Sequence, residues 1–267
     1  MSIITLDGAL AGMQPPVDFV KAATGTMVAA RPMSLLYLAG APGAAVIPAI
    51  GIGGEALTTY PGQLPFNNPA AGKSYLARLE ALATVAGVLM LVDRLWHNNA
   101  IDATSAAEQT FAGAPQIPAR DANGENTGVG VYAFVEVQGA TTTNTPTLTL
   151  KYTSSDGTQH KTAPNITPSV AASPVGTSYF MGLAAGDIGI RTPESLTLSG
   201  TWGAGTLGVV LYRVLAKLEL QAQIPNALDA LTAGFPQMYD NTVPYLLFIP
   251  GTTTTSYING HMIYTQG

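Results

Sequence analysis

The sequence predicts a mainly β protein: an antiparallel β-sandwich or jelly-roll-like domain with one long helix and an extended Pro/Gly-rich N-terminal arm. Short apolar runs bounded by Gly, Pro and Asp recur through the second half of the chain, as in antiparallel sandwiches. One stretch before them has helical spacing, and the segment before that is dense in proline. At 267 residues the chain can bury one large core, or a core with a smaller appendage.

Residues 1–68 are expected to form the arm. Proline fixes φ and lacks a backbone donor, so its density here disfavours a long helix or a central strand. The prolines lie at positions 15, 16, 32, 42, 48, 61 and 65. The segment is too apolar for a disordered tail. An extended arm that packs along its own body or across a neighbouring subunit fits both facts, and an irregular intramolecular layer is the alternative.

Residues 69–100 are expected to form a buried helix and a connector. Apolar residues recur near helical spacing at Leu76, Leu79, Leu82, Ala86 and Met90. A proline at the start and two asparagines at the end are typical of helix boundaries, so a helix of about 25 residues is expected. The apolar run 88–92 could instead begin a strand, because periodicity does not separate short buried runs of the two kinds.

Residues 101–220 are expected to form the sandwich. Asp156-Gly157 marks a hairpin turn between two strands. The candidate strand regions are 130–138, 147–163, 178–183, 195–200 and 207–220. Residues 221–267 are expected to form a C-terminal β-hairpin and edge segment, with a short helical turn, a strand at 245–249 and a hairpin that has Asn259-Gly260 at its tip. The strand 245–249 is bounded by prolines and is therefore expected at a sheet edge, where it could pair with another subunit.

Composition narrows the function classes. Charged residues make up 10% of the chain and hydrophobic residues 47%, whereas about 25% charged residues is usual. A surface this poor in charge suits contact with neighbours. The net charge of −5 and the scattered basic residues disfavour direct nucleic-acid binding. The longest apolar run, 81–92, is shorter than the roughly 18 residues of a membrane span, so no membrane contact is expected.

The stretch "PARDANGENTG" (118–128) offers metal-ligand candidates in Asp121, Asn123 and Glu125. A helix-loop-helix calcium loop needs glycine at position 6 and a bidentate Glu at position 12, but counting from Asp121 glycine falls at position 4 and Tyr132 at position 12. The favoured interpretation is an Asp/Asn-Gly turn that directs the chain into the next strand. A metal ion is the alternative, and no metal or cofactor is expected.

No catalytic or cofactor-binding residues are expected. "GIGGE" (51–55) lacks the dinucleotide-binding spacing, and Asn67 stands where a phosphate loop before Lys73-Ser74 would need glycine. The three histidines, His97, His160 and His261, fall in separate predicted elements. No nucleophile-elbow motif is present. We therefore expect a protein that is not an enzyme.

Six stretches carry a family resemblance: "DRLWHNNAI" (93–101), "PARDANGENTGVGV" (118–131), "YTSSDGT" (152–158), "LAAGDIGIRTPESLTLSG" (183–200), "PQMYDNTVPYLLFIPGTTTT" (236–255) and "GHMIYTQG" (260–267). With these phrases the region 76–267 resembles a family of virion structural proteins of tailed bacteriophages and prophages. The resemblance implies a particle component that is made in the bacterial cytoplasm and assembled onto the virion.

The function we expect is that of a capsid decoration or cement protein, a homo-oligomer that bridges subunits of the head shell. Its expected partners are the major capsid protein or other virion proteins. Two alternatives remain open at this point: a tail or neck component of the head-to-tail connection, and a carbohydrate-binding module that contacts the host surface.

Overall fold

The computed structural model describes residues 5–22 and 27–267, and it shows a mainly β fold with antiparallel sheets. This part of the predicted fold class is confirmed. Within the described residues the strands form one eight-stranded, one six-stranded and one four-stranded sheet, and every ladder between named strands is antiparallel. No helix among these residues is long and apolar enough to cross a membrane.

The eight-stranded sheet is the centre of the molecule, and we call it the central sheet. Its order is β12-β9-β14-β6-β17-β2, with β4 beside β6 and β7 beside β14. The bounds are β2 (Met33–Ser34), β4 (Glu55–Ala56), β6 (Gly87–His97), β7 (Ile101–Asp102), β9 (Val131–Gly139), β12 (Ser178–Met181), β14 (Thr206–Leu220) and β17 (Pro244–Pro250).

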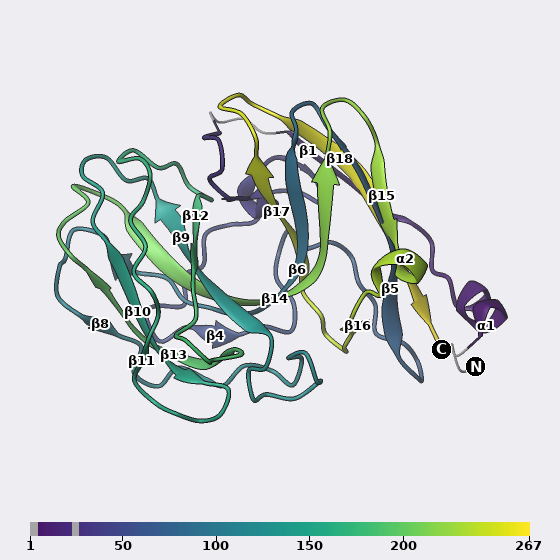
Figure 1. The fold of residues 1–267 in the computed structure, drawn as a ribbon, viewed down its shortest axis with the longest axis horizontal. Coiled ribbons are helices and arrows are strands. Elements are labelled where there is room, and N and C mark those ends of the chain that lie inside the picture. Colours follow the sequence, from purple (N-terminus) through teal and green to yellow (C-terminus); the bar gives the residue numbers. More distant parts are fainter. Residues whose placement is uncertain (1–4, 23–26) are drawn as a thin grey trace.

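Two smaller sheets pack side by side on one face of the central sheet (Figure 1), the six-stranded on the right of this view and the four-stranded on the left. The six-stranded sheet contains β1 (Val17–Ala22), β3 (Gly40–Ala41), β5 (Ser74–Ala83), β15 (Asn226–Asp229), β16 (Gln237–Met238) and β18 (Tyr257–Gln266). The four-stranded sheet contains β8 (Gln109–Thr110), β10 (Leu148–Ser154), β11 (Lys161–Thr162) and β13 (Ile190–Leu198).

Each small sheet packs on the long strands of the central sheet, and a separate hydrophobic core lies between the two layers in each case. Alternate residues of β9 and the first half of β14, such as Val135 and Val209, pack against Leu150 and Leu196 of the four-stranded sheet. The second half of β14 and β6 pack against the six-stranded sheet in the same way. β14 therefore serves both cores, and Figure 1 shows it running from one lobe into the other.

The central sheet curls so that its two ends meet. Met33 of β2 forms a bridge with Thr177, next to β12 at the opposite end of the strand order. Two backbone hydrogen bonds seal the contact, from Ser34 N to Gly176 O at 2.7 Å and from Ser178 N to Pro32 O at 2.9 Å. The sheet is thus a half-closed barrel, whose inner face holds a third core that residues 36–60 help to fill.

The long helix predicted within 69–100 is wrong, because this segment is the hairpin of β5 and β6. The register with β18 skips Ala77, so a β-bulge puts Leu76 and Leu79 on the same buried side three residues apart. That spacing imitates a helix. β6 is buried on both faces and gives no alternation, and the alternative strand beginning at 88–92 is what the structure shows. The described helices are short: α1 (Leu6–Ala11), α2 (Ala230–Ala233) and the 3₁₀ turn η1 (Leu35–Tyr37).

The N-terminal segment packs along its own chain. β1 lies between β18 and β3, β2 pairs with β17, and β4 pairs with β6. The predicted hairpin with its tip at Asn259-Gly260 is not formed, because both residues lie inside the continuous strand β18. β18 belongs to the six-stranded sheet, whereas β17 belongs to the central sheet. The predicted edge strand 245–249 corresponds to β17, which pairs with β6 on one side and, over part of its length, with β2 on the other. β2 comes from the N-terminal segment, so β17 is an interior strand there although prolines bound it.

Candidate functional site

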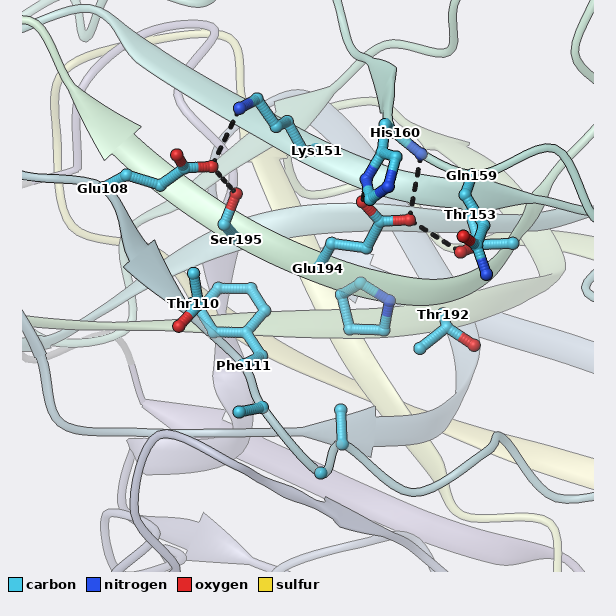
Figure 2. A pocket seen from close by; sticks show the side chains of 14 residues that line it. Glu108, Thr110, Phe111, Lys151, Thr153, Gln159, His160, Thr192, Glu194 and Ser195 are labelled. Carbon is cyan, nitrogen blue, oxygen red and sulfur yellow. Dashed lines mark hydrogen bonds and ion pairs between the residues drawn. The ribbon is translucent and has the colours of Figure 1, made fainter.

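A polar groove of about 550 Å³ lies along the four-stranded sheet (Figure 2). It is formed where residues 108–114 pass the strands β10 and β13. β13 carries a bulge here, because the register with β10 passes from Ser195 to Pro193 and leaves Glu194 as the extra residue. A bulge redirects a side chain, and Glu194 reaches polar groups of the groove as a result.

The first carboxylate of the groove is Glu108. Its Oε1 accepts hydrogen bonds from Ser195 Oγ at 2.6 Å and from Lys151 Nζ at 2.9 Å. The hydrogen bond from Ser195, followed by that from Lys151, holds the pKa of Glu108 below its ordinary value. Glu108 is therefore ionised and already partnered at neutral pH.

The second carboxylate is Glu194, which gathers Thr153 and His160. It accepts from Thr153 Oγ1 at 2.7 Å, from His160 N at 3.0 Å and from the His160 ring at 2.8 Å. Partial burial alone would raise the pKa of Glu194, but the hydrogen bonds from Thr153 and His160 outweigh it and lower the pKa. The His160 side chain is 79% exposed and forms the outer rim.

This arrangement favours binding over nucleophilic chemistry. Ser195 donates to a carboxylate, while His160 is engaged by Glu194, so no imidazole is hydrogen-bonded to the serine as a base would be. The aromatic ring of Phe111 lines the groove but is almost fully buried. The groove offers hydroxyls, carboxylates, an ammonium group and an imidazole, which suit a ligand rich in hydroxyl groups.

Sequence reasoning missed this groove. Glu108, Lys151 and Glu194 are far apart in the chain, and only strand pairing brings them together. The one local signal is the run of Thr and Ser at alternate positions of β10 and β13, which marks a polar outer face.

An apolar patch lies at the opposite end of the molecule, beside α1 and α2; we call it the terminal patch. Leu6 and Leu10 of α1 are 61% and 58% exposed, and Leu231 of α2 is 84% exposed. A groove of about 620 Å³ runs between the two helices, with Tyr75 and Phe235 in its lining. Large aliphatic side chains gathered around a concave surface are typical of a contact site.

In the loop 118–128, Asp121 is the hydrogen-bond acceptor around which the turn is built. Asp121 is fully buried and accepts five hydrogen bonds from the loop, given by Asn123 N, Glu125 N, Thr127 N, Thr127 Oγ1 and Gly128 N. Burial acts to raise the pKa of Asp121, yet the hydrogen bonds from Thr127 and the backbone hold it below its ordinary value. The side chains of Asn123 and Glu125 are exposed. Across the described ranges, no group of three or more acidic or histidine side chains is arranged around a metal position.

Two buried charge clusters lie on opposite faces of the central sheet. On the inner face, Arg94 makes a bidentate pair with Glu136, at 3.2 and 2.9 Å. On the outer face, Arg120 makes a bidentate pair with Asp93, at 3.0 and 3.1 Å, and Arg213 lies 3.7 Å from Asp93. We call these the inner and outer clusters.

The three histidines lie in different places, as their sequence positions suggested. His97 is buried in the inner cluster, where its Nδ1 accepts from Arg94 Nε and its Nε2 lies 2.9 Å from Glu55. His160 is in the polar groove, and His261 lies on the six-stranded sheet with its Nε2 4.0 Å from Glu80.

Comparison with known proteins identifies no family. No family description and no curated protein matches the chain. The compared solved structures include the infectious bursal disease virus VP2 subviral particle, with 9% identity over 96% of this chain and 80% of that chain and a TM-score of 0.19. They also include the Gt strain of the same virus, with 11% identity over 95% of this chain and 42% of that chain and a TM-score of 0.11. Scores this low carry no argument.

Proposed function

We propose that this chain is a structural protein of a bacteriophage virion, most specifically a decoration or cement protein that binds subunits of the head shell. The observation that carries the proposal is the terminal patch. Exposed leucines on α1 and α2 border a groove between the helices, and burying such side chains against a neighbour is favourable. The low charge content leaves few desolvation costs at such a contact.

A repetitive shell turns weak contacts into stable attachment, because each copy adds to the stability of the assembled state. In this proposal the protein acts as a homo-oligomer on the major capsid protein or another virion protein, without catalysis or a cofactor. A tail or neck position remains the competing location within the same class.

The test uses single exposed residues, because deletion of the arm would unfold the protein. Residues 1–68 supply β1 of the six-stranded sheet and β2 and β4 of the central sheet. Leu231→Glu should abolish co-sedimentation with particles that lack the protein. The matched control is Ile188→Glu, since Ile188 is 61% exposed and lies two residues before β13 of the four-stranded sheet. Equal co-sedimentation of wild type and Leu231→Glu would contradict the role of the patch.

Copy number in purified particles separates the locations. A shell protein should be present in hundreds of copies, whereas a neck ring should hold about six or twelve. Quantitative mass spectrometry against the major capsid protein measures this directly.

A second function, contact with a host carbohydrate, is favoured by the polar groove. Its two carboxylates are held in place by Ser195, Lys151 and Thr153, and they face an open channel (Figure 2). Binding of the intact protein to a glycan array, abolished by Glu194→Gln and kept by Leu231→Glu, would support this function. An array without specific binding would reject it.

A further inference from the structure

The half-closed barrel has an open mouth, and a pocket of about 670 Å³ lies there; we call it the mouth pocket. It opens on the inner face of the central sheet, where β6, β14 and β17 extend past the ends of β9 and β12. Its lining residues are Val88, Met90, Tyr132, Phe180, Tyr212, Val214, Lys217, Glu219 and Ile249.

Aromatic rings form one wall of the mouth pocket. The ring of Tyr212 lies 6.2 Å from that of Tyr132 and 5.9 Å from that of Phe180, measured between centroids. Tyr132 is 38% exposed, so part of its ring remains free to meet another group. Offset and tilted rings at these distances attract a further aromatic group, which makes the wall suited to an aromatic anchor.

One polar group in the pocket has no partner. The Tyr212 side chain is 5% exposed, and its hydroxyl makes no hydrogen bond with any described residue. Burial raises the pKa of Tyr212 well above its ordinary value, so the hydroxyl stays protonated and acts as a donor. The fully buried polar atoms that lack a partner do not include this hydroxyl, so it keeps contact with solvent at the pocket, where an acceptor such as a backbone carbonyl can reach it.

The strand beside the pocket has a free edge. The ladder of β14 with β9 ends at Arg213 and Val131, but the ladder with β6 continues to Leu220. Among the described residues, backbone bonding of residues 214–218 is confined to the β6 side. The side chain of Asn226 donates from Nδ2 to Glu219 O at 2.6 Å, so the free edge ends there. A second concave space, of about 590 Å³, borders the same edge between β14 and residues 225–228.

The charges at the edge restrict what can bind. Lys217 is exposed on the pocket side of β14 and forms no ion pair within the part of the chain that the structure describes. A lysine on a free edge, together with the bulge at Leu215, discourages unselective pairing of strands. An incoming segment that carries an acid opposite Lys217 would overcome this barrier.

We propose that an extended segment of a neighbouring virion protein adds alongside β14 at residues 214–218 and inserts an aromatic side chain into the mouth pocket. The segment carries an acidic residue that pairs with Lys217, and one of its carbonyl groups accepts from the Tyr212 hydroxyl. Strand addition provides main-chain hydrogen bonds, and the pocket selects the side chain. The identification of the neighbour as a virion protein rests on the proposed function; the binding mode does not.

The first test uses the free protein and a defined panel of peptides. The panel consists of blocked peptides of about six residues, with Phe, Tyr, Leu or Ala at one position and Glu or Lys two positions later, on a threonine background. We expect saturable binding in the order aromatic, Leu, Ala, with Glu preferred over Lys. Lys217→Glu should weaken binding of the Phe/Glu peptide about tenfold and reverse the Glu/Lys preference.

Two further variants complete this test. Tyr212→Phe should weaken every aromatic peptide without changing the charge preference, while the matched charge reversal Arg191→Glu, in the other lobe, should change nothing. Absence of binding across the panel, or equal binding to wild type and Lys217→Glu, overturns the proposal. Binding of N-acetylphenylalanine amide as strong as that of the peptides overturns the strand addition.

The second test compares amide hydrogen exchange in the free protein and in purified particles. Slower exchange of the amides of residues 214–218 in particles supports the proposal. If the particles contain the protein but the amides of residues 214–218 exchange as fast as in the free protein, strand addition at β14 is overturned and the proposed function stands. Absence of the protein from particles refutes the proposed function instead, and the peptide test then decides the binding mode alone.

Discussion

Asp93 and Arg94 are adjacent on β6, yet they build two different charge clusters. Successive side chains of a strand point to opposite faces, so Asp93 enters the outer cluster and Arg94 the inner one. Both residues are fully buried. The strand β6 therefore anchors different chain segments on its two faces.

In the inner cluster every nitrogen of the Arg94 guanidinium has a hydrogen-bond partner, although the buried hydroxyl of Tyr245 beside it has none among the described atoms. Arg94 uses its guanidinium for Glu136 and His97, and lies over the rings of Tyr60 and Tyr245 at 5.7 and 5.5 Å. Tyr37 of the N-terminal segment donates to Glu136 at 2.7 Å. Nearby charge holds the pKa of Arg94 above its ordinary value despite burial. This cluster fastens the N-terminal segment inside the curled sheet.

The outer cluster is only partly satisfied. Asp93 accepts from Arg120 and from Val243 N, which fixes the loops 118–128 and 239–243 to the central sheet between the cores of the four-stranded and six-stranded sheets. Arg213 has a single hydrogen bond, from Nη1 to Gln237 O, and its Nε and Nη2 have no partner among the described atoms. Burial of a charge is costly where its hydrogen bonds are incomplete, so the two clusters should differ in what they contribute to stability.

The largest effect is expected from Glu136→Ala. This change leaves the Arg94 guanidinium buried without its counter-charge, and we expect the free energy of unfolding to fall by about 3–5 kcal/mol. Urea denaturation followed by circular dichroism measures the loss. The double variant Arg94→Met/Glu136→Leu should be more stable than Glu136→Ala, because it leaves no buried charge. A double variant less stable than either single change would contradict this account.

A smaller, pH-dependent effect is expected from His97. Burial, and next the charge of Arg94, lower the pKa of His97 from 6.5 in the unfolded chain to about 2. Below pH 6.5 the unfolded chain therefore binds a proton that the folded chain does not, and stability falls as the pH falls. The expected slope is about 1.4 kcal/mol per pH unit.

The range between pH about 6.5 and 5 isolates this effect, because ordinary carboxylates titrate below it. His97→Gln keeps an acceptor for Arg94 and a donor for Glu55, so it should flatten the slope in this range. An unchanged slope in His97→Gln would assign the pH dependence to another group.

The sequence predicted the strands better than their partners. Alternation and turn residues located β9, β10 and β14, because these signals are local. The bulge at Ala77 and the two-sided burial of β6 produced a false helix there. Asn259-Gly260 is a typical turn dipeptide and was therefore predicted as a hairpin tip, although both residues lie inside β18, whose pairing depends on contacts far apart in sequence.

The residues of the candidate sites were harder to predict from the sequence than the strands. Asp121 stood out because it sits in a dense local motif, and the turn interpretation agrees with its five hydrogen bonds. Glu136 and Glu194 gave no signal, because their partners Arg94 and His160 are 42 and 34 residues away. Pairings at such separations are set by sheet register, which a single sequence does not specify.

The smallest effect is expected from Arg213→Met, and it is the sharpest test of the contrast between the clusters. Methionine matches the length of the arginine stem and can pack on the ring of Tyr239, over which Arg213 now lies at 5.0 Å. Burial lowers the pKa of Arg213 despite the nearby charge of Asp93, as expected for a guanidinium with two unpartnered nitrogens. Removing it leaves Asp93 with both bonds from Arg120, so the free energy of unfolding should change by less than about 1 kcal/mol. Arg94→Met, measured by the same denaturation, should cost several times more, because Glu136 would then be buried without its counter-charge. Equal losses in the two variants would show that the hydrogen bonding of the buried guanidinium groups does not distinguish the clusters.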